Sequence, residues 1–152
     1  MNNFHLWEPG DDAYMKMILR ELGNGKTYRN LGTRLHPIGD FDSPGARIPG
    51  EPARVYRTAR GLRVFFIGRY GEPPGDFLES LVDLGCDPLY SKMCRQRGYY
   101  AARVDPKIPG YPGNTAVTAL VGQTGEAHPG WDRFIRFHDE LTRALEPGTI
   151  LV

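Results

Sequence analysis

The chain has few cysteines, no long apolar run and almost no net charge, and each absence excludes a class of protein. Only Cys86 and Cys94 occur in 152 residues, whereas small secreted domains usually carry several disulfides. No stretch approaches the roughly 18 consecutive apolar residues of a membrane helix, and the first residues lack the pattern of a secretory signal. We therefore expect a cytoplasmic protein with two reduced, packed thiols.

Sequence motifs of established chemistry are also missing. The chain contains no Gly-x-Ser-x-Gly elbow, no Walker loop, no dinucleotide fingerprint and no His-Glu-x-x-His pair. Two cysteines without a neighbouring histidine do not indicate a zinc site. The sequence thus predicts no cofactor, no metal site and no identifiable catalytic residue.

What the chain does contain predicts a single globular α+β domain over residues 1–152. This length suits one domain with a sizeable core, and 19 glycines and 13 prolines predict many turns. Helical spacing of apolar residues between capping residues predicts about four helices. These helices, at 13–22, 77–84, 88–97 and 131–145, are expected to pack on one small antiparallel or mixed sheet.

The segment between the first two predicted helices is expected to start with a long irregular connection. Residues 24–52 are rich in Gly and Pro and read as a long loop, with one short strand expected at 34–38. Further strands are predicted at 99–104, 115–121 and 149–152. A stiff turn segment at 105–114 is expected to join the first two of these.

The strongest strand pattern is a β-hairpin over 53–70. Two β-rich runs flank the pair Arg60-Gly61, and a two-residue turn there places Tyr56 opposite Phe65. Alternation separates an apolar face, expected to pack on the helices, from a face expected to be exposed. The exposed face combines guanidinium groups with aromatic rings: Arg54, Tyr56, Arg63, Phe65 and Arg69.

This Arg/aromatic face is the predicted ligand-binding surface. Guanidinium groups bind phosphates and carboxylates through a planar fork, and aromatic rings provide stacking area. The face lies in a positive band, because residues 26–70 hold nine basic and three acidic residues although the whole chain carries only +1. We expect a small non-enzymatic binding protein, inhibitor or adaptor. Its partner would be a nucleotide, a nucleic acid or an acidic protein surface; alternatively, the arginines only cover hydrophobic neighbours.

Two other functions stay open. A small hydrolase or transferase could act on a phosphorylated or nucleotide substrate, with His36, Asp40 or His138 moving protons. His36, Asp40 and Asp42 could also bind a divalent cation, although Asp-x-Asp is common in turns. His138 lies in the apolar stripe of the last helix, where a hydrogen-bonded core histidine is the simpler interpretation. The remaining alternative is a structural subunit of a larger assembly.

Overall fold

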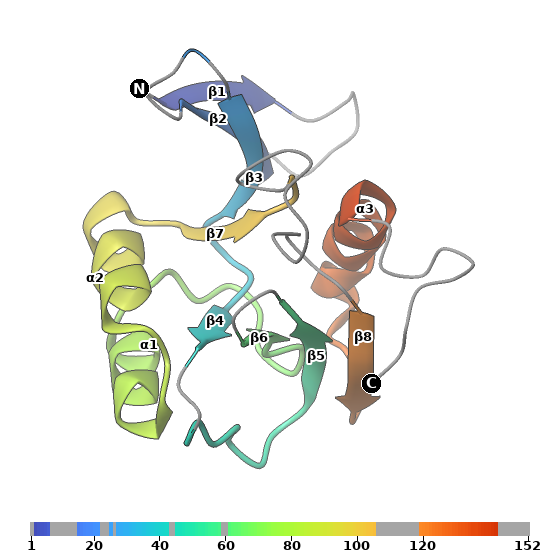
Figure 1. Ribbon diagram of the computed structural model, residues 1–152. Coiled ribbons are helices and arrows are strands. Elements are labelled where there is room, and N and C mark those ends of the chain that lie inside the picture. The colour runs from blue at the N-terminus through green and yellow to red at the C-terminus, as the bar shows by residue number, and fades with distance from the viewer. Residues whose placement is uncertain are drawn as a thin grey trace.

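Two four-stranded antiparallel sheets and three α-helices make up the described parts of the chain (Figure 1). The computed structural model describes residues 2–6, 15–21, 25, 27–42, 45–58, 61–105 and 119–142. In Figure 1, α1 and α2 lie on one side of the sheets and α3 on the opposite side. The mixed α+β class is confirmed, whereas the prediction of about four helices on one sheet is corrected to three helices and two sheets.

The first sheet has the strand order β1-β2-β3-β7. Its strands are β1 (Asn2–Leu6), β2 (Met15–Glu21), β3 (Thr27–Thr33) and β7 (Tyr100–Arg103). The prediction of a helix at 13–22 was wrong where the structure describes it, because β2 pairs with β1 on one side and β3 on the other. Main-chain pairing with residues distant in sequence overrides the good helix propensity of this segment.

The expected irregular connection at 24–52 contains two strands. Besides β3, strand β4 (Ile38–Phe41) lies within it. The short strand predicted at 34–38 falls largely on the bend between β3 and β4. Residues 45–52 are irregular, as expected.

The second sheet has the order β4-β6-β5-β8 and contains the predicted hairpin. Its other strands are β5 (Ala53–Arg57), β6 (Leu62–Phe65) and β8 (Ala119–Thr124). The hairpin is confirmed, but each partner differs by two residues from the prediction, so that Tyr56 lies opposite Arg63 and not Phe65. A shift of two residues preserves the two faces of the hairpin, since side chains alternate with a period of two.

The hairpin reversal lies between Thr58 and Gly61. The Thr58 N–H donates to the Gly61 carbonyl at 2.8 Å, while Arg60, which we placed in the turn, lies outside the described residues. Gly61 is needed for a close approach between strands. A Cβ at this position would collide with the carbonyl oxygen of Phe41 and lie 2.7 Å from the Cα of Asp42.

Gly61→Ala should therefore lower the free energy of unfolding by about 1–3 kcal/mol, because the end of β4 must move to admit the methyl group. Urea denaturation measures this loss. Gly50→Ala is the matched control, since no atom lies within 4 Å of its added Cβ. Equal stability of the two variants would contradict the proposed role of Gly61.

Local signals mark the start of α2 and the glycine ends of both helical segments, whereas α1 begins after Gly75 without a side-chain cap. Helix α1 (Asp76–Ser80) continues as the 3₁₀ helix η1 (Leu81–Leu84), which ends at Gly85 with φ 110°. Helix α2 (Pro88–Arg97) begins after Asp87, whose side chain accepts from the Leu89 N–H at 3.0 Å, and it ends at Gly98. These caps satisfy main-chain groups that a helix leaves unpaired at its ends.

Helix α3 (Asp132–Thr142) follows a 3₁₀ turn, η2 (Pro129–Trp131). It confirms most of the helix predicted at 131–145, and residues 143–145 lie outside the described residues. The same is true of the strand predicted at 149–152 and of most of the turn segment at 105–114. Strand β7 confirms the prediction at 99–104, and β8 overlaps the end of the strand predicted at 115–121.

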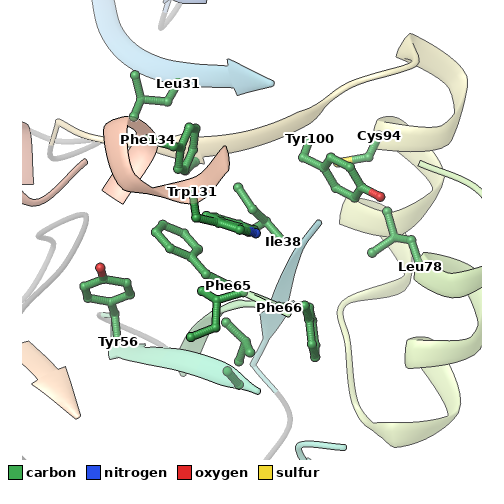
Figure 2. Close-up of a cluster of buried hydrophobic side chains, with 14 of the residues drawn as sticks. Leu31, Ile38, Tyr56, Phe65, Phe66, Leu78, Cys94, Tyr100, Trp131 and Phe134 are labelled. Atoms are coloured by element: carbon green, nitrogen blue, oxygen red, sulfur yellow. The ribbon is translucent and has the colours of Figure 1, made fainter. Parts of the chain in front are cut away.

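An aromatic cluster forms the centre of the core, between the second sheet and the start of α3 (Figure 2). Phe65 stacks on Trp131 with ring centroids 5.1 Å apart and meets Phe134 edge-on at 5.4 Å. Such pairs add to the stability from apolar burial. The inner side of α2 contributes Cys94, which lies near Tyr100 of β7 in Figure 2. Among the described residues, no helix is long and apolar enough to cross a membrane.

Candidate functional site

The Arg/aromatic face of the hairpin is turned into the molecule, against α3. Tyr56 and Phe65 are fully buried, and Arg63 is 7% exposed. The expectation that this face is exposed was therefore wrong. The physical reason is that α3 brings both an apolar stripe and its own polar groups, His138 and Asp139, onto this face, so that the arginines can be buried with hydrogen-bond partners.

Asp139 is the centre of a buried polar network. Its two carboxylate oxygens accept from the hydroxyl of Tyr56 at 2.6 Å and from the guanidinium of Arg54 at 2.7 Å. Arg54 also donates to the Tyr56 oxygen at 2.6 Å. Burial alone would raise the pKa of Asp139, but hydrogen bonds from His138 and Tyr56 and the charge of Arg54 hold it below its usual value. Asp139 is thus an ionised carboxylate that neutralises Arg54.

His138 completes this network and is held in one tautomer. Arg63 donates to its Nε2 at 2.9 Å, so Nε2 must be the acceptor and Nδ1 carries the proton toward Asp139, also at 2.9 Å. Burial, assisted by the charges of Arg63 and Arg54, lowers the pKa of His138 to about 4 against the opposing effect of Asp139. Because both ring nitrogens are bonded and the side chain is fully buried, His138 is a neutral structural group.

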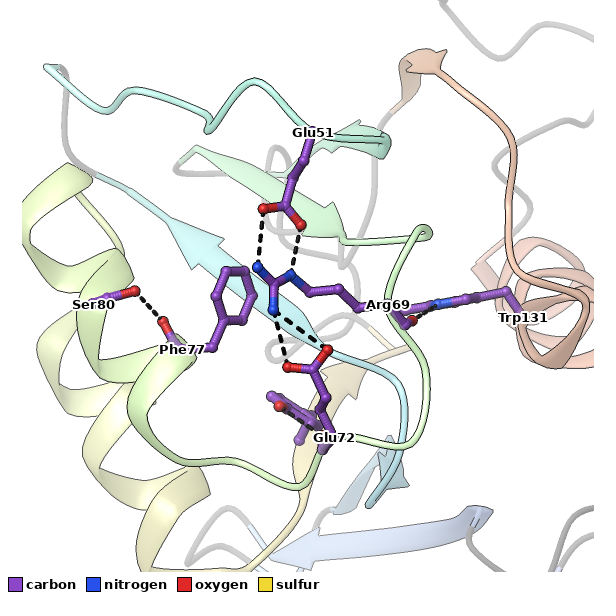
Figure 3. A network of polar contacts seen from close by, with 7 residues as sticks. Glu51, Arg69, Glu72, Phe77, Ser80 and Trp131 are labelled. Carbon is purple, nitrogen blue, oxygen red and sulfur yellow. Dashed lines mark hydrogen bonds and ion pairs between the residues drawn. The ribbon is translucent and has the colours of Figure 1, made fainter.

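Arg69 lies apart from the other four hairpin residues, because β6 ends at Phe65. Its guanidinium pairs with Glu51 at 2.7 Å and with Glu72 at 3.0 Å, and it lies 3.7 Å above the ring of Phe77 (Figure 3). The carbonyl of Arg69 accepts from the indole of Trp131 at 2.6 Å. Arg69 therefore joins loop 45–52 to α1 and the core. The ligand-binding role expected of the five hairpin residues stays a prediction, which these internal contacts do not favour.

The positive band at 26–70 is neutralised in several places, partly by carboxylates from other parts of the chain and partly by Asp40 and Glu51 of the band itself. Arg29 pairs with Asp105 at 2.8 Å, in addition to the pairs that Arg54 and Arg69 make. Arg63 lies opposite Asp40 on β4, and this charge opposes the effect of burial, which raises the pKa of Asp40. A local excess of arginine in sequence thus does not become one exposed positive surface.

The groups proposed for acid–base chemistry do not line either of two open hollows on the described surface. His36 is buried: its Nε2 donates to the Gly130 carbonyl at 2.8 Å, and its Nδ1 bonds to the Thr33 hydroxyl. Two open hollows, of about 490 Å³ and about 560 Å³, lie beside α1 and α2 and beside loop 45–52, and neither is lined by His36, Asp40 or His138. The enzyme hypothesis receives no support from this arrangement. In the described ranges, no three His, Cys, Asp or Glu side chains could hold a metal ion together.

A different surface, on the first sheet, combines cations with aromatic rings. Met17, Leu31 and Ala102 lie on the side of this sheet that contacts the core, so the alternate positions form its other side. That side carries Lys16 and Arg20 from β2, Tyr28 and Asn30 from β3, and Arg103 from β7. The described residues of β2, β3 and β7 place no Asp or Glu on it.

Tyr99 and Arg97 extend this surface at the end of α2. The ring of Tyr99 lies against the position of Gly32 on β3, where an added Cβ would be 3.3 Å from it. The guanidinium carbon of Arg97 lies 4.9 Å from the centroid of the Tyr99 ring. We call the following residues together the basic face: Lys16, Arg20, Tyr28, Asn30, Arg97, Tyr99 and Arg103.

Among the described residues, Asn30 and Arg97 of the basic face each have a buried hydrogen-bond donor for which no acceptor is present. Asn30 is 7% exposed, and within the described part of the chain its Nδ2 has no hydrogen-bond partner. The Nη1 of Arg97 is likewise buried and unpaired, although its Nε donates to the Met93 carbonyl at 3.2 Å. A buried donor without a partner costs about 1–3 kcal/mol, so such groups call for a specific explanation.

Sequence reasoning missed the basic face because it treated 13–22 as a helix and 24–52 as a loop. The signal that could have revealed it is alternation. Lys16, Ile18 and Arg20 are spaced by two residues, as are Tyr28, Asn30 and Gly32, and this spacing places each set on one side of a strand.

Comparison of the chain with models of protein families, with curated proteins and with solved structures found no match. Function is therefore inferred from the chemistry of the surfaces described above.

Proposed function

We propose that this protein is a small non-enzymatic binding protein, an adaptor or inhibitor, whose basic face binds an anionic partner. One observation carries the proposal: the buried, unpaired amide donor of Asn30 lies among cationic side chains on a face where the described strands place no carboxylate. An anion supplies the missing acceptor and the opposite charge at the same place.

The position of Asn30 in the sheet supports this function. Asn30 lies directly opposite Arg103 on β7 and Ile18 on β2, and Arg20 follows Ile18 on the same side of β2. Diagonal neighbours in a sheet are about 7–8 Å apart, within reach of long side chains. An anion bound at Asn30 would therefore lie within reach of guanidinium groups from two neighbouring strands. A local field of this kind attracts anions even though the net charge of the chain is only +1.

Charge reversal on the basic face should weaken binding to a polyanion. We expect fluorescein-labelled heparin to bind the wild-type protein with an affinity that falls steeply with salt, as counterion release requires. Arg20→Glu should weaken this binding about ten-fold or more at low salt. It should also reduce the slope of log affinity against log salt concentration by about one or more, the loss of about one ionic contact. Fluorescence anisotropy at several salt concentrations measures both quantities.

Arg136→Glu is the matched control, since Arg136 is exposed on α3 and the charge change is the same. This variant should retain nearly wild-type binding. If the two variants lose affinity equally, the partner is held by overall charge and not by the basic face. If the wild-type protein does not bind heparin at low salt, the anionic partner itself must be abandoned.

A further inference from the structure

Resting on the proposed function, we infer that the basic face binds single-stranded nucleic acid. Asn30 and Arg97 would donate to the phosphate backbone, and the rings of Tyr28 and Tyr99 would stack against unpaired bases. Protein groups that hold a single strand without reading its sequence are of these two kinds, cations along the backbone and aromatic platforms for the bases.

The unpaired donors indicate an oxyanion ligand. The Nδ2 of Asn30 and the Nη1 of Arg97 both need an acceptor, and a phosphodiester offers oxygens with several lone pairs along a repeating chain. Side-chain amides and guanidinium groups are common donors to nucleic-acid phosphates. The cations around Asn30 supply the charge-assisted contacts that strengthen such bonds.

The aromatic rings favour nucleic acid over an acidic peptide. Tyr28 and Tyr99 are both partly exposed on the basic face, and the guanidinium of Arg97 already lies against the Tyr99 ring. Carboxylate side chains offer no flat surface that could stack on these rings, whereas every base presents a flat π surface to them. In a duplex the bases stack on each other and their surfaces are covered, so a single strand is the form that fits.

The order of these groups along β3 fits an extended ligand. Tyr28, Asn30 and Gly32 follow one another on the same side of the strand, and Tyr99 lies over Gly32. Four residues of a strand span about 13 Å, so ring, amide and ring follow in that order over this length.

The test is fluorescence anisotropy of a labelled oligothymidylate with the 152-residue protein, compared with a duplex and with polyglutamate as competitor. The wild-type protein should bind the single strand more tightly than the duplex, and polyglutamate should compete weakly. Tyr28→Leu should weaken single-strand binding roughly 5- to 150-fold, the range found when one stacking ring is lost. Tyr28→Phe keeps the ring and should bind nearly as the wild type does.

A second variant tests the contacts to the phosphate backbone. Arg97→Gln should also weaken single-strand binding and lower its salt dependence, with circular dichroism confirming the fold of each variant. Equal binding by Tyr28→Leu and Tyr28→Phe, or preference for the duplex or for polyglutamate, would overturn the inference. Heparin binding that is sensitive to Arg20→Glu, together with no oligonucleotide binding, would overturn this inference alone and leave the proposed function standing.

Discussion

Replacing Asp139 with alanine should lower the free energy of unfolding by about 3–5 kcal/mol, because it leaves buried charge and hydrogen-bond donors without a partner. The carboxylate accepts from Tyr56, Arg54 and His138 at 2.6–2.9 Å. Urea denaturation gives the loss from the shift of the midpoint at an unchanged slope. A loss of this size would be a large fraction of the stability of an ordinary domain.

Glu140→Ala is the control for the loss of a carboxylate from α3, since Glu140 is the next residue and is exposed. It should change stability by less than about 0.5 kcal/mol. Asp139→Asn keeps the side-chain volume but removes the charge. A loss close to that of Asp139→Ala would assign the effect to the buried charge, and a loss below about 1 kcal/mol in Asp139→Ala itself would show that the network contributes little.

Local signals were enough to predict much of the fold. The Asp87-Pro88 start and the glycine stops Gly85 and Gly98 lie within a few residues of the helix ends that they specify. The alternation in β5 and β6 likewise predicted the hairpin. Strand β2 could not be predicted in this way, because its conformation depends on β1 and β3, whose main-chain groups pair with it along its length.

The functional surface was harder to predict than the fold. Alternation correctly predicted which residues share a face of the hairpin, but it did not predict that the Arg/aromatic face is buried. The groups that accommodate Arg54 and Arg63, namely Asp139 and His138, lie 85 and 75 residues further along the chain. Composition of a face reports its chemistry, whereas its exposure depends on distant residues. The basic face was also hard to predict, because its cations come from two strands and a helix end that are adjacent only after folding.

The stability of this protein should fall as the pH falls from 6.5 toward 4, and His138 should account for a large part of the loss. Burial lowers the pKa of His138 from 6.5 to about 4. Between these values the unfolded chain binds a proton that the folded protein does not. The contribution of His138 is therefore fully present above pH 6.5 and is lost progressively below it, to a total of roughly 3 kcal/mol.

His138→Gln provides the measurement, since glutamine offers a donor and an acceptor but does not titrate. Its free energy of unfolding, from urea titrations between pH 4.5 and 7.5, should depend less on pH than that of the wild type, whatever its absolute stability. Burial raises the pKa of Asp40 against the effect of Arg63, so this carboxyl acts in the opposite sense. Because Asp40 is present in both proteins, its contribution largely cancels when the pH profile of His138→Gln is subtracted from that of the wild type. Parallel profiles for wild type and His138→Gln would show that His138 is not held neutral by burial.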